Sequence, residues 1–203
     1  VLNACDYGVP QRRERVCVVG FRDDLNATWA FPSPTHSRAS LLWSQRRDGA
    51  YWERHRVSKR ARVALVPSPA PEPPELPLAE PWLTVRDALV GLPEPTEADS
   101  PDILNHRLQL GARSYAGHTG SALDEPAKTL KAGAHGVPGG ENMLRYPSGQ
   151  VRYFTVRESA RLQTFPDDYE FQGAWGEAMR QIGNAVPVRL GTAVAAAVRD
   201  ALT

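Results

Sequence analysis

The segment 153–190 most constrains the fold, because its local signals fix where helices begin and end. Thr155 and Glu158 form a capping box, in which each side chain accepts a hydrogen bond from a backbone N–H group at a helix start. The pattern therefore predicts a helix that begins near Val156. This helix should end at the residue before Pro166, because proline cannot continue the backbone hydrogen-bond ladder and restricts the residue before it.

Two further helices are predicted after this one. The first runs from about Ala174 to Ile182, with Gly183 free to take the left-handed conformation that often ends a helix. The second begins at Pro187, which suits a first helical turn. Its apolar residues recur at helical spacing and should share one buried face: Leu190, Val194, Ala197, Val198 and Ala201.

Length and composition limit the class of protein. The chain has 203 residues, of which 41% are hydrophobic, enough for one large or two small domains with a buried core. No apolar run approaches the roughly 20 residues of a membrane span, and residues 1–8 lack the pattern of a secretory signal. Two cysteines are too few for a disulfide framework or a metal cluster. We therefore expect a cytoplasmic protein with no membrane partner and no metal.

The net charge of +1 conceals an uneven distribution. Residues 1–62 carry 12 Lys and Arg against 6 Asp and Glu, a balance of +6. Residues 63–104 carry 1 against 8, a balance of −7, and residues 105–203 carry 11 against 9, a balance of +2. A basic region beside an acidic one permits a polyanionic partner, although a charge run is more often a solvated face.

The opening segment 6–22, DYGVPQRRERVCVVGFR, combines a predicted strand with fixed positive charges. Residues 16–21 are apolar on both faces, as expected for a strand in the middle of a sheet. Gln11, Arg13 and Arg15 share one parity just before it, so their side chains should leave the same face. At the ligand edge of an α/β sheet, two arginines would supply charged donors to an anionic or carbonyl-bearing substrate. The alternative is an arginine pair that caps a sheet edge by binding surface carboxylates.

DYGVPQRRERVCVVGFR, TVRESARLQTFPDDYEF and QIGNAVPVRLG follow one another along the chain and bracket a variable insert. They resemble the eighth, ninth and tenth of the ten ordered motifs of the DNA (cytosine-5)-methyltransferases, and the core of the eighth is Gln-x-Arg-x-Arg. In that family the insert is the target-recognition domain. Residues 123–145 also resemble recognition domains of its bacterial branch, including a Thr-Leu pair at Thr129 and Leu130.

The resemblance implies a reaction and roles for particular residues. In the family, a thiolate adds to C6 of a cytosine flipped out of double-stranded DNA, and C5 then takes a methyl group from S-adenosylmethionine. By resemblance, Arg15 approaches O2 of the flipped base and stabilises the developing charge. Gln11 and Arg13 would hold the loop and the catalytic pocket together, with a structural salt bridge of Arg13 as an equal alternative. The tenth motif should line the S-adenosylmethionine pocket, mainly through the backbone of Asn184, Ala185 and Val186.

The family's other signature motifs do not occur in this chain. Its Gly-rich cofactor loop, Pro-Cys nucleophile and Glu-Asn-Val motif belong upstream of the eighth motif, and none is present. Cys5 has no preceding proline and Cys17 lies in an apolar run, so neither is expected to be the nucleophile. We therefore expect a C-terminal portion of such an enzyme, inactive without the missing N-terminal catalytic half on the same or a separate chain.

The first part of the insert is basic and then acidic. The segment Gln45–Arg62 interleaves Lys and Arg with Tyr51 and Trp52, which suits either contacts to DNA phosphates or a mobile solvated loop. The next segment, 67–81, is proline-rich and acidic and should be extended. It is a poor candidate for DNA contact.

The second part of the insert holds most of the candidate DNA contacts. Residues 82–92 predict a short helix capped by Thr84. Residues 111–150 are glycine-rich and have the character of a loop that follows a groove closely. The candidate donors to DNA in this stretch are His118, Lys128, Thr129, Lys131, His135 and Arg145.

We therefore predict an α/β fold, a fragment of a Rossmann-like S-adenosylmethionine-dependent methyltransferase domain plus an irregular, mainly β target-recognition domain. Residues 1–22 supply a catalytic-domain strand, residues 23–150 the recognition domain and residues 151–203 the catalytic-domain helices. Arg157 and Arg161, one helical turn apart, should brace the two domains. The complete enzyme would serve restriction-modification or phage-encoded protection. The alternatives are a non-catalytic DNA-specificity subunit of a split methyltransferase and a degenerate protein that binds DNA or another protein without turnover.

Overall fold

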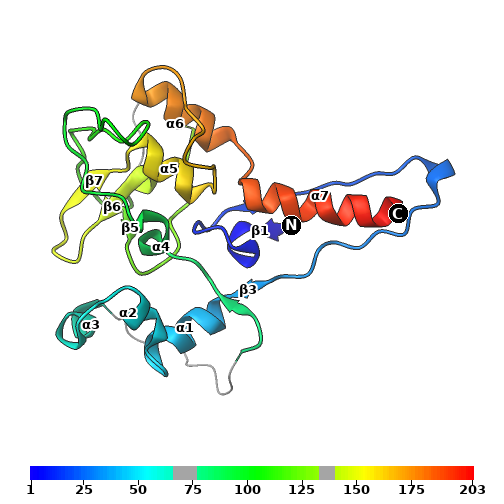
Figure 1. The fold of residues 1–203 in the computed structure, drawn as a ribbon, viewed down its shortest axis with the longest axis horizontal. Coiled ribbons are helices and arrows are strands. Elements are labelled where there is room, and N and C mark those ends of the chain that lie inside the picture. The colour runs from blue at the N-terminus through cyan, green and yellow to red at the C-terminus, as the bar shows by residue number, and fades with distance from the viewer. Residues whose placement is uncertain (66–76, 133–139) are drawn as a thin grey trace.

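The chain is mixed α/β in a computed structural model that describes residues 1–65, 77–132 and 140–203 (Figure 1). The strands are β1 (Leu2–Asn3), β2 (Glu14–Arg15), β3 (His36–Ser37), β4 (Glu80–Pro81), β5 (Ser121–Ala122), β6 (Met143–Arg145) and β7 (Val151–Tyr153). The α-helices are α1 (Arg38–Arg46), α2 (Ala50–Arg54), α3 (Lys59–Leu65), α4 (Val85–Leu89), α5 (Val156–Leu162), α6 (Trp175–Asn184) and α7 (Val188–Leu202). Short 3-10 helices are η1 (Ala4–Tyr7), η2 (Asp23–Leu25) and η3 (Gly140–Asn142).

The strands of the described residues form three small sheets. β1 pairs antiparallel with β2, so that Leu2 lies opposite Arg15, and β3 pairs in parallel with β4. The third sheet has the order β5-β6-β7, with β5 parallel and β7 antiparallel to β6. The β6–β7 hairpin spans residue 150, which is the expected end of the insert.

α5 begins as predicted and ends earlier. Its capping box is present, with the Thr155 and Glu158 side chains each accepting a backbone N–H of the other residue. The helix stops at Leu162 because Thr164 takes a left-handed conformation with φ of 59°. The N–H of Phe165 then bonds the Ala160 carbonyl, which closes the helix before Pro166 is reached.

α6 also differs from the prediction at its C-terminal end. It includes Gly183, which we expected to terminate the helix in a left-handed conformation. Gly183 is instead helical and buried, and a Cβ atom there would lie 2.5 Å from the backbone nitrogen of Ala132. Glycine is required at this position by the close approach of another backbone segment, which the sequence of a helix end does not reveal.

The largest hydrophobic core lies between α4, α5, α6 and the β5–β7 sheet. It is formed by Val85, Ala127, Leu130, Leu144, Phe154, Val156, Ala160, Leu162, Phe171, Ala178, Met179 and Ile182. Val85 comes from α4, which is shorter than predicted but carries a capping box between Thr84 and Asp87. This core joins the part of the insert after residue 82 to the helices that follow the insert.

The two ends of the chain pack against each other in a second core. Leu190 of α7 is buried with Leu2, Ala4, Tyr7 and Val9. This contact confirms that the opening segment and the closing helices belong to one folded body. The predicted buried face of α7 is only partly correct, because Leu190 is buried while the apolar residues further along it stay partly exposed.

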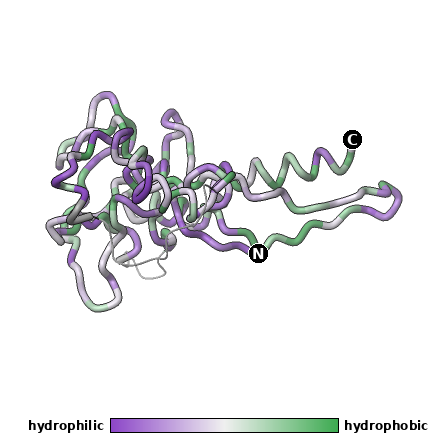
Figure 2. The backbone as a smooth tube through the Cα atoms, turned by 90° about the horizontal axis from the view of Figure 1, so that it is seen from below, coloured by the Kyte–Doolittle hydropathy of each residue, from purple (hydrophilic) through white to green (hydrophobic). Residues whose placement is uncertain are grey.

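The predicted strand at residues 16–21 is wrong for the described chain. β2 ends at Arg15, and the chain continues as a long extended arm that runs out beside α7 and returns to β3 (Figures 1 and 2). Alternation typical of a strand persists, since Val16 and Val18 are 76% and 89% exposed while Cys17 is partly buried. Among the described strands, none pairs with residues 16–21. The limbs of the arm touch through Phe21 and Trp29, whose ring centroids lie 5.7 Å apart.

The basic segment Gln45–Arg62 is not a loop. Its residues contribute to α1, α2 and α3, which hang from β3 as a helical unit that we call the α1–α3 module (Figure 1). Tyr51 and Trp52 are buried with Leu41 in a third core, so their role is packing. The alternative of a solvated loop is therefore wrong, and phosphate contacts by the charged residues of the segment stay a prediction.

Some predicted features fall outside the described residues. Most of the proline-rich acidic segment 67–81 lies there, although its end forms β4. His135 and the glycines around it lie there as well. The described part of 111–150 is not loop alone, because it contains β5, η3 and β6. Among the described helices, none is long and apolar enough to cross a membrane.

Candidate functional site

Gln11, Arg13 and Arg15 occupy the same side of the opening segment, as their parity predicts. Gln11 and Arg13 are buried and Arg15 is partly buried, whereas the intervening Arg12 and Glu14 are exposed. The segment is held by the β1–β2 pair and by a bridge between Gln11 and Ala127. Three side chains are thus presented in order from the core to the surface.

The guanidinium group of Arg13 joins three distant parts of the chain. Its Nη1 donates to the carbonyl oxygen of Leu130 at 3.0 Å. Its Nη2 donates to the carbonyl oxygens of Gly183 at 2.6 Å and Ala185 at 2.9 Å. Burial, helped by the charge of Arg15, lowers the pKa of Arg13 to about 10, so the group keeps its charge at neutral pH. Among the described residues its partners are carbonyls and an amide, so the salt-bridge alternative is wrong.

Two glutamines extend this Arg13 clamp. The Gln11 side-chain oxygen accepts from the Leu130 N–H at 3.2 Å, and its nitrogen donates to the Leu162 carbonyl at 3.4 Å. Gln163 is fully buried and donates to the Ile182 carbonyl at 2.6 Å. The last turns of α5 and α6 are thereby tied to the segment around Leu130. Sequence reasoning missed Gln163, because a buried glutamine that binds a carbonyl has no sequence signature.

The turn Asn184–Val186 is fixed on one side and open on the other. Its backbone is anchored by Arg13 through the Ala185 carbonyl. Asn184 is exposed, Ala185 is partly buried, and Val186 is 59% exposed. Both backbone groups of Ala185 are engaged, its N–H by the Gln181 and Ile182 carbonyls and its carbonyl by Arg13, so the exposed residues of the turn are Asn184 and Val186.

Arg15 lies where the clamp reaches the surface. Its described contact is a hydrogen bond from Nη1 to the carbonyl oxygen of Glu14 at 2.7 Å. Its backbone pairs with Leu2 in the β1–β2 ladder, which fixes the position of its Cα atom. The guanidinium group thus sits on a held backbone and keeps most of its donors available.

The candidate DNA contacts have different neighbours in the structure. Thr129 donates to the Arg12 carbonyl at 2.6 Å, and the Lys128 ammonium donates to the Thr119 hydroxyl at 3.1 Å. Lys131 lies 2.9 Å from Glu141, which also lies 3.8 Å from the His118 ring. Arg145 is exposed at the end of β6. The structure therefore brings Thr129 next to the clamp and groups Lys131 with His118. Arg145 lies against Gly120, the residue after the Thr119 that contacts Lys128.

The cysteines have different environments. Cys5 is fully buried, and burial raises the pKa of its thiol to about 12, so that it is protonated at neutral pH. Cys17 is partly buried on the arm. Within the described part of the chain, no cluster of His, Cys, Asp and Glu has the composition of a metal site.

The two arginines of α5 join it to the second half of the insert. Arg157 is fully buried and donates to the carbonyls of Leu104, Pro166 and Tyr169. Arg161 forms a bidentate ion pair with Asp167 and also donates to carbonyls just after α4. These contacts are braces between packed segments, as their spacing led us to expect.

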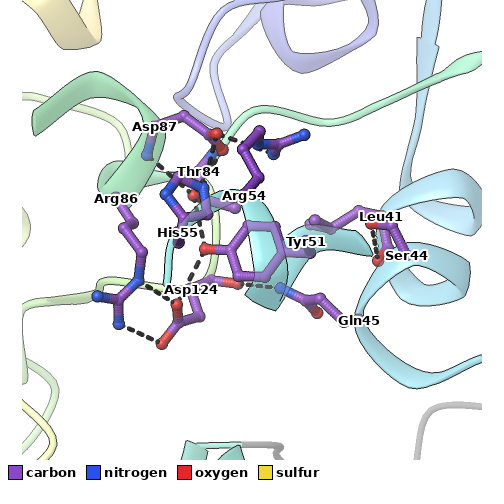
Figure 3. Close-up of polar contacts among 10 residues, drawn as sticks. All are labelled: Leu41, Ser44, Gln45, Tyr51, Arg54, His55, Thr84, Arg86, Asp87 and Asp124. Atoms are coloured by element: carbon purple, nitrogen blue, oxygen red, sulfur yellow. Dashed lines mark hydrogen bonds and ion pairs between the residues drawn. The ribbon is translucent and has the colours of Figure 1, made fainter. Parts of the chain in front are cut away.

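A buried polar network anchors the α1–α3 module to the rest of the chain (Figure 3). The Tyr51 hydroxyl lies 2.9 Å from both Thr84 and Asp124, and Arg86 binds both Asp124 oxygens, at 2.6 and 3.0 Å. Burial, together with the Asp124 charge, raises the pKa of Tyr51. Sequence analysis did not single out Asp124, whose partners are 38 and 73 residues away.

A second carboxylate in the same network is Asp87. It accepts from His55 at 2.9 Å and from Arg54 at 2.9 Å, while also capping α4 through Thr84. Burial alone would raise its pKa, but the hydrogen bonds from His55 and Thr84 and the charge of Arg54 lower it overall. Asp87 and Asp124 therefore hold the inner face of the α1–α3 module against α4 and β5.

Comparison with known proteins identifies the family. The family model of the C-5 cytosine-specific DNA methylases matches residues 1–66 and 95–200. The type II methyltransferase M.NgoFVII of Neisseria gonorrhoeae is 34% identical over 188 residues, which are 92% of this chain and 45% of that protein. The type II methyltransferase M.SacI of Streptomyces achromogenes is 32% identical over 100% of this chain and 51% of its own length.

A further relative, the type II methyltransferase M.MthTI of Methanothermobacter thermautotrophicus, is 28% identical and is matched over 56% of its length. The chain therefore spans about half the length of the curated relatives it matches. The gap in the match to the family, between residues 66 and 95, falls inside the insert. The chain belongs to the C-5 cytosine-specific DNA methylase family.

Proposed function

We propose that this chain is the C-terminal part of a DNA (cytosine-5)-methyltransferase, which acts on double-stranded DNA together with an N-terminal catalytic half. That half would carry the Pro-Cys nucleophile, and S-adenosylmethionine would supply the methyl group. Residues 1–22 and 151–203 belong to the catalytic domain in this proposal, and residues 23–150 form the target-recognition domain. Alone, the chain would not catalyse methyl transfer.

The observation that carries the proposal is the Arg13 clamp. It connects the arginine-bearing segment, the Thr129–Leu130 pair and the turn Asn184–Val186 through one guanidinium group. In the proposed enzyme these three are the base-binding, DNA-binding and cofactor-binding parts of the site. Arg13 and Gln11 then act as positioning residues, which fix the geometry without touching the reacting atoms.

The residues present fit a cofactor that packs against exposed side chains on a fixed turn. Asn184 and Val186 face outward, and Ala185 is held from behind by Arg13. The turn would form one wall of the S-adenosylmethionine pocket, and the N-terminal half would supply the remaining walls. Arg15, presented from the β1–β2 pair, would donate to O2 of the flipped cytosine and stabilise charge on the pyrimidine as the ring is attacked.

The exposed apolar residues support an N-terminal partner. Val16 and Val18 alternate with partly buried neighbours along an extended segment whose backbone has no strand partner in the described chain. An added strand would cover them and satisfy the free backbone groups at once. The arm and the partly exposed face of α7 would then be the surface that packs on the catalytic sheet. In this proposal the DNA contacts are Lys128, Thr129, Lys131, His135 and Arg145.

The test is methyl transfer by this chain mixed with, or fused to, the N-terminal half. Activity should require both parts. In the complete enzyme, Arg15→Ala should lower turnover by a factor of about 100 or more, with a much smaller loss of DNA affinity, because a preorganised cation acts mainly on the transition state. Arg107→Ala is the control, since Arg107 is an exposed arginine that lies near Asp99, outside the arm, α7 and the candidate DNA contacts.

Two results would contradict the proposal. Equal losses of turnover and affinity in Arg15→Ala would mean that Arg15 only positions the DNA. Efficient methyl transfer by this chain alone would mean that the nucleophile lies within it.

A further inference from the structure

We propose that the outer side of the α1–α3 module binds the phosphate backbone of duplex DNA beside the recognised sequence. The residues concerned are those of 56–62, which we call the basic turn: Arg56, Lys59, Arg60 and Arg62. The inference rests on the proposed function and adds a second contact surface to it. The ligand is the sugar-phosphate backbone, so the surface would add affinity and length to the interface without reading bases.

The inner and outer sides of the module differ in how their charged residues are paired. Its inner side is fixed by the carboxylates of Asp87 and Asp124, which engage Arg54, His55 and Tyr51 (Figure 3). The charge of residues 36–65 is strongly positive, with 8 Lys and Arg against 2 Asp and Glu. Three of the other cations of the module, Arg56, Lys59 and Arg60, are exposed on the opposite, outer side.

The basic turn is folded back on the connection between α1 and α2, at Gly49. Arg62 donates from Nε to the Val57 carbonyl at 3.0 Å, and its Nη1 lies 3.4 Å from where a Cβ of Gly49 would be. Within the part of the chain that the structure describes, Arg56, Lys59 and Arg60 have no carboxylate partner. The turn therefore has a defined backbone while its charged groups stay available.

A continuous chain of contacts leads from the C-terminal end of α1 to the candidate DNA-binding segment. Gln45, in the last turn of α1, donates to the Asp124 carbonyl at 2.8 Å. The next residue, Glu125, pairs with Arg12, and the Arg12 carbonyl accepts the hydroxyl of Thr129. Because each step is a direct hydrogen bond or ion pair, the module is attached firmly to the segment that carries Lys128 and Thr129. DNA that lies on that segment would extend toward the module.

The expected effect follows from counterion release. Each phosphate contact lowers the slope of log K against log [salt] by about 0.9 for duplex DNA. Two lost contacts should therefore change the slope by about 1.8, and the affinity at 0.1 M salt by a factor of up to about 60. The recognition sequence itself should be unaffected, since phosphate contacts carry no base information.

The experiment compares Lys59→Ala/Arg60→Ala with the unaltered complete enzyme on two duplexes. One duplex spans about one helical turn around the site, roughly 10 base pairs, and the other extends for a further turn or more on both sides. We expect weaker binding and a smaller salt slope on the long duplex only, with equal binding and equal methyl transfer on the short one. Arg107→Ala/Arg180→Ala is the control for charge, because it removes two exposed cations outside the basic turn, the arm, α7 and the candidate DNA contacts.

Unchanged binding of the long duplex, or an equal loss on both lengths or in the control, would overturn the proposal. Because residues 59 and 60 are exposed, we expect no change in the melting temperature of the double variant. If its melting temperature does fall, Lys59→Glu is a second variant for the same binding test. Failure of the proposed function would look different. In that case, the unaltered enzyme would fail to methylate either duplex.

Discussion

Gly183→Ala tests the packing on which the Arg13 clamp depends. The added Cβ would lie 2.5 Å from the nitrogen and 2.7 Å from the Cα of Ala132, and 2.7 Å from the carbonyl carbon of Lys131. All three are backbone atoms, so no side chain can rotate away. The helix α6 and the segment 130–132 must move apart, and this displacement pulls the carbonyls of Gly183 and Leu130 away from Arg13.

The sign of the effect depends on two opposing contributions. Alanine is favoured over glycine inside a helix by about 1 kcal/mol. Overpacking of a tight contact typically costs about 1–3 kcal/mol, and backbone overlap on three atoms places this case at the upper end. We therefore expect a net loss of about 2 kcal/mol in the free energy of unfolding, which for a chain of this size is about 4–8 °C in Tm.

The same helix contains a matched control. Gly176 also lies in α6, but a Cβ there would meet no atom within 4 Å. Gly176→Ala should leave stability unchanged or raise it by up to about 1 kcal/mol. Thermal or denaturant unfolding of both variants gives the comparison directly. If the two variants melt at the same temperature, residues 131–132 do not approach α6 this closely. The packing that holds the Gly183 and Leu130 carbonyls at Arg13 would then be absent.

Two other perturbations give clear expectations. Tyr51→Phe removes the hydroxyl beside Thr84 and Asp124 and should cost about 1–3 kcal/mol in unfolding experiments, since buried partners lose a hydrogen bond; a change below about 0.5 kcal/mol, the usual limit for surface substitutions, would mean that water replaces it. At pH 8 a thiol reagent should modify Cys17 faster than Cys5, whose pKa is raised to about 12 from 9.0. The thiol of Cys5 ionises at a lower pH in the unfolded chain than in the folded chain. The free energy of unfolding should therefore fall as the pH rises from about 9 to 12. An Ala variant of Cys5 that keeps the full pH dependence would exclude this cause.

Local signals predicted the helices well where both partners of an interaction lie within a few residues. The capping boxes at Thr155 and Thr84 are present because each requires only a hydroxyl and a carboxylate three positions apart. The end of α5 was less predictable. Proline sets the last possible residue of a helix, but Thr164 adopted a left-handed conformation before that limit.

Long-range partners explain most of the differences. An apolar alternating run such as residues 16–21 predicts a strand, but a strand forms only when another segment lies beside it. Tyr51 and Trp52 looked like part of a basic binding surface, because the sequence does not show that Leu41 and Val57 surround them. Gln11, Arg13 and Arg15 were correctly predicted to share one side of their segment, and their different burial came from the fold around them.

Arg13 shows why the partners of a buried cation are hard to predict. A charged residue in a sequence suggests a carboxylate partner, and the candidate carboxylates can be counted. Carbonyl groups belong to every residue, so the acceptors at Leu130, Gly183 and Ala185 leave no mark in the sequence. A planar guanidinium can reach several carbonyls at once, which a lysine ammonium at the same place cannot do with the same geometry.

The clamp also explains how the chain tolerates a variable insert. Arg13 and Gly183 are 170 residues apart, and their contact closes the whole insert into a loop. The entropic cost of closing a loop grows slowly, by about 0.6 kcal/mol for each doubling of its length. Changes in the length of the segment between residues 66 and 95, where the family match breaks, therefore add little to the cost of forming the clamp. The short segment around Leu130 must keep its place, because Arg13 binds the Leu130 carbonyl and Gln11 binds the Leu130 N–H.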